Sequence, residues 1–89
     1  MSEHVILDFY SEGCAPCRAA RPAVKLAKEK LPQVEFRDID ASANGELCDR
    51  YRIKSVPTLI YLRDGEEMRR ISGVPSARDI VEMVDVGAD

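Results

Sequence analysis

Apolar runs separated by polar segments divide the chain into alternating extended and helical stretches. Residues 4–10 form an apolar run interrupted only by Asp8, which is typical of a strand buried on both faces. From about Pro16 to Lys30, apolar residues recur at intervals of three and four, which predicts an amphipathic helix. Its buried positions would be Cys17, Ala20, Val24, Ala27 and Leu31. Its solvated face would carry Arg18, Arg21, Lys25, Lys28 and Glu29.

The rest of the chain shows the same kind of alternation and then a hairpin. Asp64-Gly65, between two apolar runs, predicts a tight turn joining two antiparallel strands. Ser76 can cap a last helix because Asp79 follows three residues later. The expected elements are strands over residues 34–40, 57–62 and 67–71, a short helix over about 44–51, and a helix from Ser76 that stops at Gly87.

The order of these elements is βαβαββα, which indicates an α/β protein. Because the first three strands alternate with helices, we expect them to pair in parallel through right-handed crossovers. The hairpin then adds the fourth strand in antiparallel orientation. We therefore expect a single domain over residues 1–89, with a four-stranded mixed sheet and helices on both faces, a three-layer α/β/α arrangement.

Composition and charge narrow the functional classes. The chain has 89 residues, of which 45% are hydrophobic and 33% charged, as expected for one small soluble domain. A net charge of −3 without a basic stripe gives no support for nucleic-acid binding. The N-terminus does not resemble a signal peptide, and no apolar stretch approaches the roughly 18 residues of a membrane span. We therefore expect a cytoplasmic monomer without nucleic-acid or membrane partners.

Two cysteines stand two residues apart where the first strand passes into the first helix, in the segment Cys14-Ala15-Pro16-Cys17. Unpaired amides and the macrodipole at a helix N-terminus favour negative charge, so a thiol there loses its proton more readily. In a reducing compartment such a pair indicates catalysis or metal binding rather than a structural bridge. Cys14, at the helix start, is the expected attacking thiol. Cys17, one turn further in, would be the more buried, resolving thiol.

The remaining thiol and the single histidine complete the set of soft ligands. Zinc could use Cys48 and His4 with the cysteine pair, but four-ligand zinc sites usually bring a second closely spaced pair. We therefore expect no metal and no organic cofactor. Cys48 is interpreted as a buried or half-buried helix residue, with a regulatory thiol as the alternative. His4 is interpreted as a solvated or strand-edge residue.

Two further positions suit thiol chemistry. Asp8 is the only charged residue in an apolar strand, six residues before Cys14. Burial would raise the pKa of its carboxyl group, which could then exchange a proton with a nearby thiol. The alternative, that Asp8 faces water at a strand edge, is less favoured because its neighbours are apolar on both sides. The Val56-Pro57 bond begins the third strand, and either isomer could do so.

Together these residues resemble the thioredoxin family over roughly residues 5–84. A lone C-x-x-C is weak evidence of this, but an ordered set of landmarks is strong. The landmarks are the segment from Asp8 to Arg18, Pro22 five residues after the second cysteine, Ile39-Asp40, Ile53 to Thr58, Asp64-Gly65 and Gly73.

The resemblance implies a thioredoxin-like fold in a short form, without the strand and helix that precede this core in full-length members. It implies reduction of protein disulfides, with a thioredoxin-reductase-type protein as electron donor. Val56-Pro57 would be a cis bond beside the dithiol, Asp8 the buried acid and Gly73 a point of close approach. The substrate chain would lie on Gly13, Ala15, Pro16, Val56, Pro57, Gly73 and Val74.

Several positions depart from the family pattern. Gly13 and Tyr10 stand where the family has tryptophans, and the dipeptide between the cysteines is Ala-Pro. Phe36 stands where the family has a lysine near the buried acid, so we expect Asp8 to titrate at higher pH. The alternatives are a glutaredoxin-like reductant, a binding module on the same fold, and a redox sensor using Cys48. Glutaredoxins usually have a basic residue before the motif and a later Gly-Gly segment, and this chain has neither.

Overall fold

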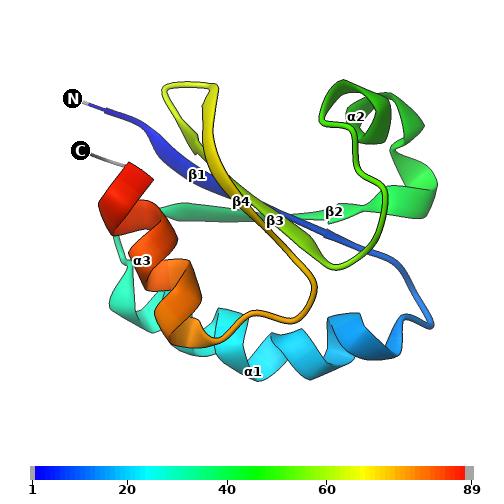
Figure 1. Cartoon of the computed structure of the whole chain (residues 1–89), viewed down its shortest axis with the longest axis horizontal. Helices are drawn as coiled ribbons and strands as arrows, with labels where there is room; N and C mark the ends of the chain where they lie inside the picture. Colours follow the sequence, from blue (N-terminus) through cyan, green and yellow to red (C-terminus); the bar gives the residue numbers. More distant parts are fainter. Residues whose placement is uncertain (1, 88–89) are drawn as a thin grey trace.

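The computed structural model describes residues 2–87, which form a four-stranded sheet flanked by helices (Figure 1). The strand order is β2-β1-β3-β4. The strands are β1 (His4–Tyr10), β2 (Glu35–Asp40), β3 (Thr58–Arg63) and β4 (Glu66–Ser72). The helices are α1 (Ala15–Lys30), the 3-10 turn η1 (Ala41–Ala43), α2 (Gly45–Arg50) and α3 (Ala77–Gly87). The expected order of elements is confirmed, with bounds shifted by one or two residues.

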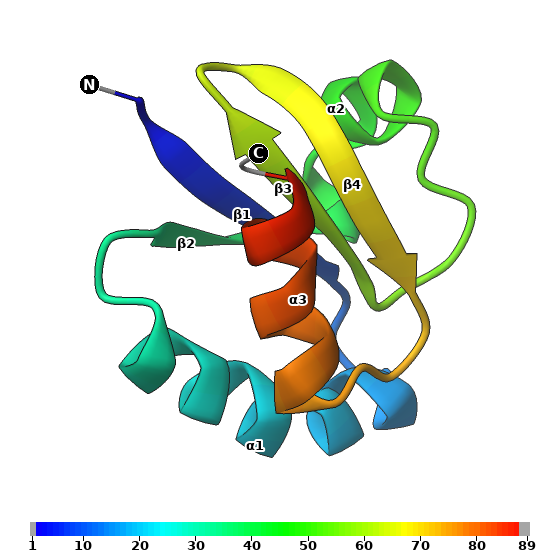
Figure 2. The ribbon, with the colours of Figure 1, turned by 60° about the vertical axis from the view of Figure 1, so that its left-hand side comes forward.

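The sheet separates two apolar cores, which confirms the expected three layers. Helices α1 and α3 pack together on one face, while α2 covers the other (Figure 2). Side chains alternate along β1, so Val5, Leu7 and Phe9 enter the core beneath α2. Ile6 enters the core beneath α1 and α3. By the same alternation, Asp8 lies on the α1 side of the sheet.

Strand β3 does not run in the expected direction. It pairs with β1 in antiparallel orientation, with Phe9 opposite Thr58 and His4 opposite Arg63, whereas only β2 is parallel to β1. The physical reason is the shortness of α2. Six helical residues rise about 9 Å, whereas a six-residue strand spans about 20 Å. The α2 connection therefore stays near one end of the sheet, and β3 must run back from there.

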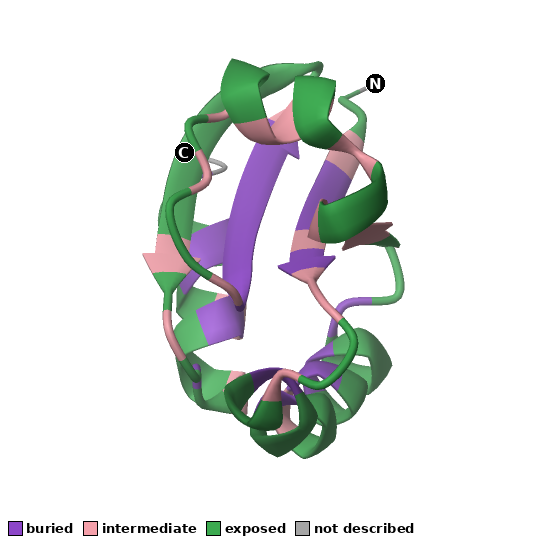
Figure 3. Cartoon of the chain, turned by 90° about the vertical axis from the view of Figure 1, so that its right-hand side faces the viewer, coloured by how far each residue is buried: buried purple, intermediate pink, exposed green. Residues whose placement is uncertain are grey.

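The two central strands are the most buried part of the sheet (Figure 3). Phe9 in β1 and Leu59, Ile60 and Tyr61 in β3 are fully inaccessible to solvent. Most residues of the edge strand β4 are exposed. The end of β1 is thus held by β2 on one side and by β3 on the other. Its chain continues through the turn at Gly13, where φ is +78°, into α1.

Candidate active site

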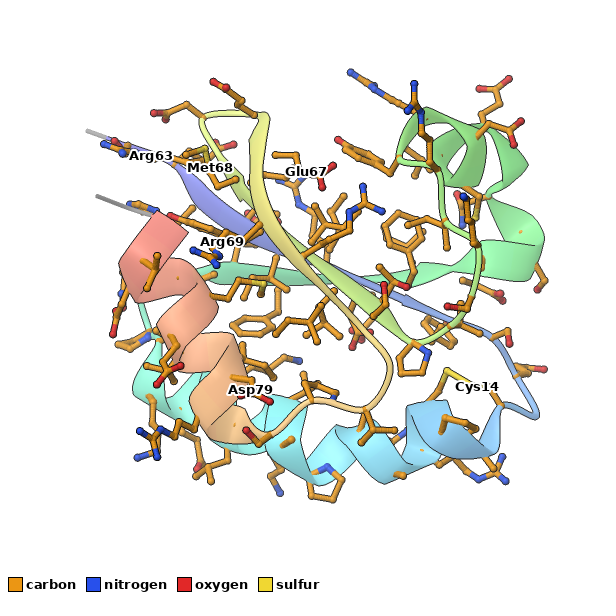
Figure 4. The ribbon with its side chains drawn as sticks, in the orientation of Figure 1. Cys14, Arg63, Glu67, Met68, Arg69 and Asp79 are labelled. Atoms are coloured by element: carbon orange, nitrogen blue, oxygen red, sulfur yellow. A yellow bond between two sulfur atoms is a disulfide. The ribbon has the colours of Figure 1, made fainter. Side chains whose placement is uncertain are left out.

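The two cysteines lie at the N-terminus of α1, next to the ends of the central strands (Figure 4). Cys14 is the N-cap residue, with extended backbone, and its sulfur accepts a hydrogen bond from the amide of Cys17 at 3.2 Å. Pro16 occupies the first turn, where its missing N–H would have had no helical partner. Cys14 and Cys17 are joined in a disulfide, with Cα atoms 5.3 Å apart.

The charge around this helix end favours a thiolate when the disulfide is reduced. The first turn of α1 contains no acidic side chain. Lysine and arginine predominate along the exposed side of α1, where the only acidic residue is Glu29. A sulfur at the N-cap position also receives the field of the free amide ends. A free thiol at Cys14 is therefore expected to ionise more readily than a cysteine in a flexible peptide.

The two cysteines differ in their exposure to solvent. Cys17 is buried, with 8% of its surface exposed, whereas Cys14 is only partly covered. Cys14 is therefore the more accessible of the two, while Cys17 lines the cavity that also contains Asp8. This difference agrees with the order of attack expected from the sequence.

The loop before β3 lies against the dithiol. The Val56-Pro57 peptide bond is cis, as the family resemblance implied, and the carbonyl oxygen of Val56 lies 3.8 Å from the sulfur of Cys14. The amide of Gly73 donates a hydrogen bond to the carbonyl oxygen of Pro57 at 2.9 Å. The neighbouring Val74 is 53% exposed. These contacts bring the Val56-Pro57 and Gly73-Val74 segments to the side of the dithiol.

The residues expected to hold the substrate differ in exposure. Gly13, Ala15 and Pro16 are exposed beside Cys14, while Val56 is half-buried. Pro57 is buried, so its ring is covered, and its backbone oxygen is already bonded to Gly73. The accessible part of the expected surface is therefore Gly13 and the first turn of α1, together with Val74. Figure 4 shows Arg63, Glu67, Met68 and Arg69 well away from Cys14, around the β3–β4 hairpin.

Asp8 lies behind the disulfide in a cavity of about 480 Å³. The carboxyl group is half-buried, and burial raises its pKa from 3.8 to about 6. The negative charge of Asp38 raises the pKa further, and the positive charge of Lys28 lowers it. Cys17 lines the same cavity. The cavity wall consists of Asp8, Tyr10, Cys17, Arg21, Val24, Lys25, Lys28 and Asp38.

Asp38 and Lys28 were not identified from the sequence as members of the site. Asp38 lies directly beside Asp8 in the parallel β1–β2 register. Its place in the alternating pattern of residues 34–40 could have suggested this position. Lys28 is exposed, as expected, but its ammonium group lies 5.7 Å from the centre of the Phe36 ring. Position 36 thus carries no lysine, yet a positive charge from α1 acts on Asp8.

The remaining candidate ligands lie elsewhere. His4 is at the opposite end of β1, where its imidazole forms a hydrogen bond with the hydroxyl group of Tyr61. Cys48 is half-buried in α2, packed against the core on the other face of the sheet. Its sulfur lies 3.5 Å from the carbonyl oxygen of Ala41. The Cys48 expectation is confirmed, and neither side chain approaches the dithiol. No helix within residues 2–87 has the length and apolar character needed to cross a bilayer.

A dithiol at a helix N-terminus, on a mixed sheet with helices on both faces, defines a class of disulfide-exchanging α/β proteins. The comparisons with known proteins agree. The family model described as Thioredoxin matches residues 1–86. A thioredoxin of Chlamydia pneumoniae is 31% identical over 81 residues, which cover 91% of this chain and 79% of that protein.

Solved structures give the same result. The thioredoxin of Fasciola hepatica has a TM-score of 0.85 and 29% identity, covering 96% of this chain and 81% of its own. A mutant thioredoxin from Halobacterium salinarum has a TM-score of 0.88 and 26% identity, covering 98% and 76% respectively. The chain belongs to the thioredoxin family. It is a thiol–disulfide oxidoreductase of the protein-disulfide reductase type.

Proposed function

We propose that the reduced protein donates two electrons to disulfides of other proteins, with Cys14 as nucleophile, Cys17 as resolving thiol and Asp8 as base. The observation that carries this assignment is the unequal exposure of two bonded cysteines at a helix N-terminus. No metal or organic cofactor enters the reaction. The site of action is the cytoplasm, and the working unit is a monomer.

In the first step, the Cys14 thiolate attacks one sulfur of a substrate disulfide. A mixed disulfide forms, and the other substrate sulfur leaves as a thiolate that takes a proton from water. The amide of Cys17, which contacts the Cys14 sulfur at 3.2 Å, supports the ionised form of the nucleophile. The substrate chain lies on Gly13, on Ala15 and Pro16 in the first turn of α1, and on Val74, whose side chain is exposed.

In the second step, the Cys17 thiol transfers its proton to the carboxylate of Asp8 and attacks the Cys14 sulfur. The mixed disulfide breaks, the second substrate sulfur leaves as a thiolate that takes a proton from water, and the Cys14–Cys17 disulfide remains. Asp8 then releases its proton to water. The shared cavity of Asp8 and Cys17 supports this proton transfer. A pKa of about 6 also suits a base that must be mostly ionised at neutral pH and still accept a proton. A thioredoxin-reductase-type protein then restores the dithiol.

The assignment can be tested by following insulin reduction with dithiothreitol as electron source. Cys14→Ser should abolish the activity. Cys17→Ser, reduced beforehand and then freed of dithiothreitol, should accumulate the mixed disulfide with the substrate, which non-reducing electrophoresis detects. Cys48→Ser is the matched control and should retain full activity, because Cys48 lies on the other face of the sheet. Activity that survives in Cys14→Ser would contradict the assignment. Strong preference for glutathionylated substrates would instead favour the glutaredoxin-like alternative.

A further inference from the structure

The cavity behind the disulfide collects opposite charges from three elements of the fold. Besides Asp8 itself, β1 contributes Tyr10, and the neighbouring strand β2 contributes the carboxylate of Asp38. The opposite wall is helix α1, which contributes Cys17 and the three cationic side chains Arg21, Lys25 and Lys28. Asp8 thus lies in a cavity that has a second carboxylate on its β2 wall and three cations on its α1 wall.

Lys28 differs from the other two cations because an aromatic ring lies beneath it. Its ammonium nitrogen is 5.7 Å from the centre of the Phe36 ring, within the range of a cation–π interaction. Phe36 is half-buried and packs against the core beneath α1 and α3. It precedes Asp38 by two residues in β2, so the two side chains lie on the same face of the sheet. The ring of Phe36 therefore holds the Lys28 ammonium group at the wall of the cavity that Asp8 and Asp38 also line.

We propose that Lys28 is a positioning residue for proton transfer at Asp8, and that its ammonium group, seated over Phe36, favours the ionised carboxylate against the opposing charge of Asp38. The proposal rests on the role of Asp8 as base for Cys17. It assigns a function to a lysine of α1 that the amphipathic pattern alone places among solvated residues. The aromatic residue at position 36 thereby acts as the platform for that charge.

The direction of each effect on the pKa of Asp8 follows from the sign of the neighbouring charge. Lys28 is the cation whose charge lowers the pKa of Asp8, and Asp38 is the anion that raises it. Removal of the Lys28 charge should raise the pKa of Asp8 by about half a unit, because a solvated charge contributes less than one full unit. The ratio of carboxylate to acid at a given pH should then fall about threefold. Removal of the Asp38 charge should shift the pKa in the opposite direction.

The test is a titration of the Asp8 carboxyl carbon by NMR in the full chain, with the pH profile of insulin reduction measured on the same variants. Lys28→Met should raise the pH at which Asp8 is half titrated. It should also shift the rising limb of the pH–rate profile to higher pH by the same amount. Lys28→Arg keeps the charge and should restore both. Asp38→Asn should lower the midpoint. Phe36→Leu keeps Lys28 but removes the ring, and should raise the midpoint by less than Lys28→Met.

Lys25→Met is the matched control, since Lys25 lines the same cavity from the same helix but is not the cation seated over Phe36. The titration midpoint of Asp8 in Lys25→Met should stay near its value in the unsubstituted protein. An unmoved midpoint in Lys28→Met, or an equal rise in Lys25→Met, would overturn the positioning role. A different result would show that Asp8 is not the base for Cys17. In that case Asp8→Asn would reduce insulin at the rate of the unsubstituted protein, whatever the Asp8 titrations show.

Discussion

Replacing Asp8 by asparagine should stabilise the protein at neutral pH while slowing its reaction. The folded protein raises the pKa of this carboxyl group from 3.8 to about 6, chiefly by burial. The folded state therefore binds the proton more tightly than the unfolded state. Stability contributed by the protonated carboxyl is fully present below about pH 4 and declines as pH rises to about 6. Above that pH, the buried charge lowers the free energy of unfolding by a constant amount.

The size of the penalty follows from the pKa difference. At about 1.36 kcal/mol for each pKa unit, the difference corresponds to about 3 kcal/mol. The carboxyl group borders an open cavity and is partly reached by solvent, so we expect roughly 2 kcal/mol. Asparagine has nearly the same shape and carries no charge, and the polar cavity can hydrate its amide. Asp8→Asn should therefore raise the free energy of unfolding by roughly 2 kcal/mol at pH 7.5 and change it little at pH 4.

Urea unfolding of the oxidised protein at both pH values measures this difference directly. Glu12→Gln serves as the control, because Glu12 is an exposed acid in the turn before Cys14. It should leave the unfolding midpoint unchanged at either pH. The reasoning would be refuted if Asp8→Asn gave no gain at pH 7.5, or if the gain were the same at pH 4. In either case the carboxyl group would not be held in an unfavourable ionised state.

Two further substitutions test the packing and capping that hold the site in place. A Cβ at position 87 would lie 2.9 Å from two ring carbons of the fully buried Tyr61. Gly87→Ala should therefore lower the free energy of unfolding by about 1–3 kcal/mol and the Tm by at least about 4 °C. Gly45→Ala is the control, because Gly45 has open space around it, and it should cause neither loss. The hydroxyl of Ser76 accepts a hydrogen bond from the amide of Asp79 at 3.0 Å, and the Asp79 carboxylate accepts one from the amide of Ser76 at 3.2 Å. Ser76→Ala should therefore cost about 1 kcal/mol in urea unfolding, whereas Ser76→Thr should retain most of the stability. An unchanged Tm in Gly87→Ala, or an unchanged urea midpoint in Ser76→Ala, would contradict these contacts.

The periodicity of apolar residues, together with the turn signal at Asp64-Gly65 and the cap at Ser76, was sufficient to locate the four strands and the three α-helices. The 3-10 turn η1 was not predicted. The direction of β3 was not predictable in the same way. Parallel and antiparallel strands can have the same alternation, and the decisive quantity was the length of α2 relative to the sheet. The hydrophobic pattern predicts that a segment is a helix. It does not say how far that helix carries the chain across the sheet.

In the active site, too, some charged and ionisable residues are recognisable from the local sequence, and others only from the fold. Cys14, Cys17 and Asp8 stand out in the sequence as candidates because each conflicts with its local surroundings: paired thiols at a helix start, and a carboxyl in an apolar strand. Such local conflicts indicate function, because a residue that reduces stability is expected to persist only where the site requires it. Lys28 conflicts with nothing, since a lysine on the polar face of a helix is what the pattern expects. Its effect on Asp8 arises only when α1 packs across β2, so residues that tune a site from another element are detectable in the fold and not in the local sequence.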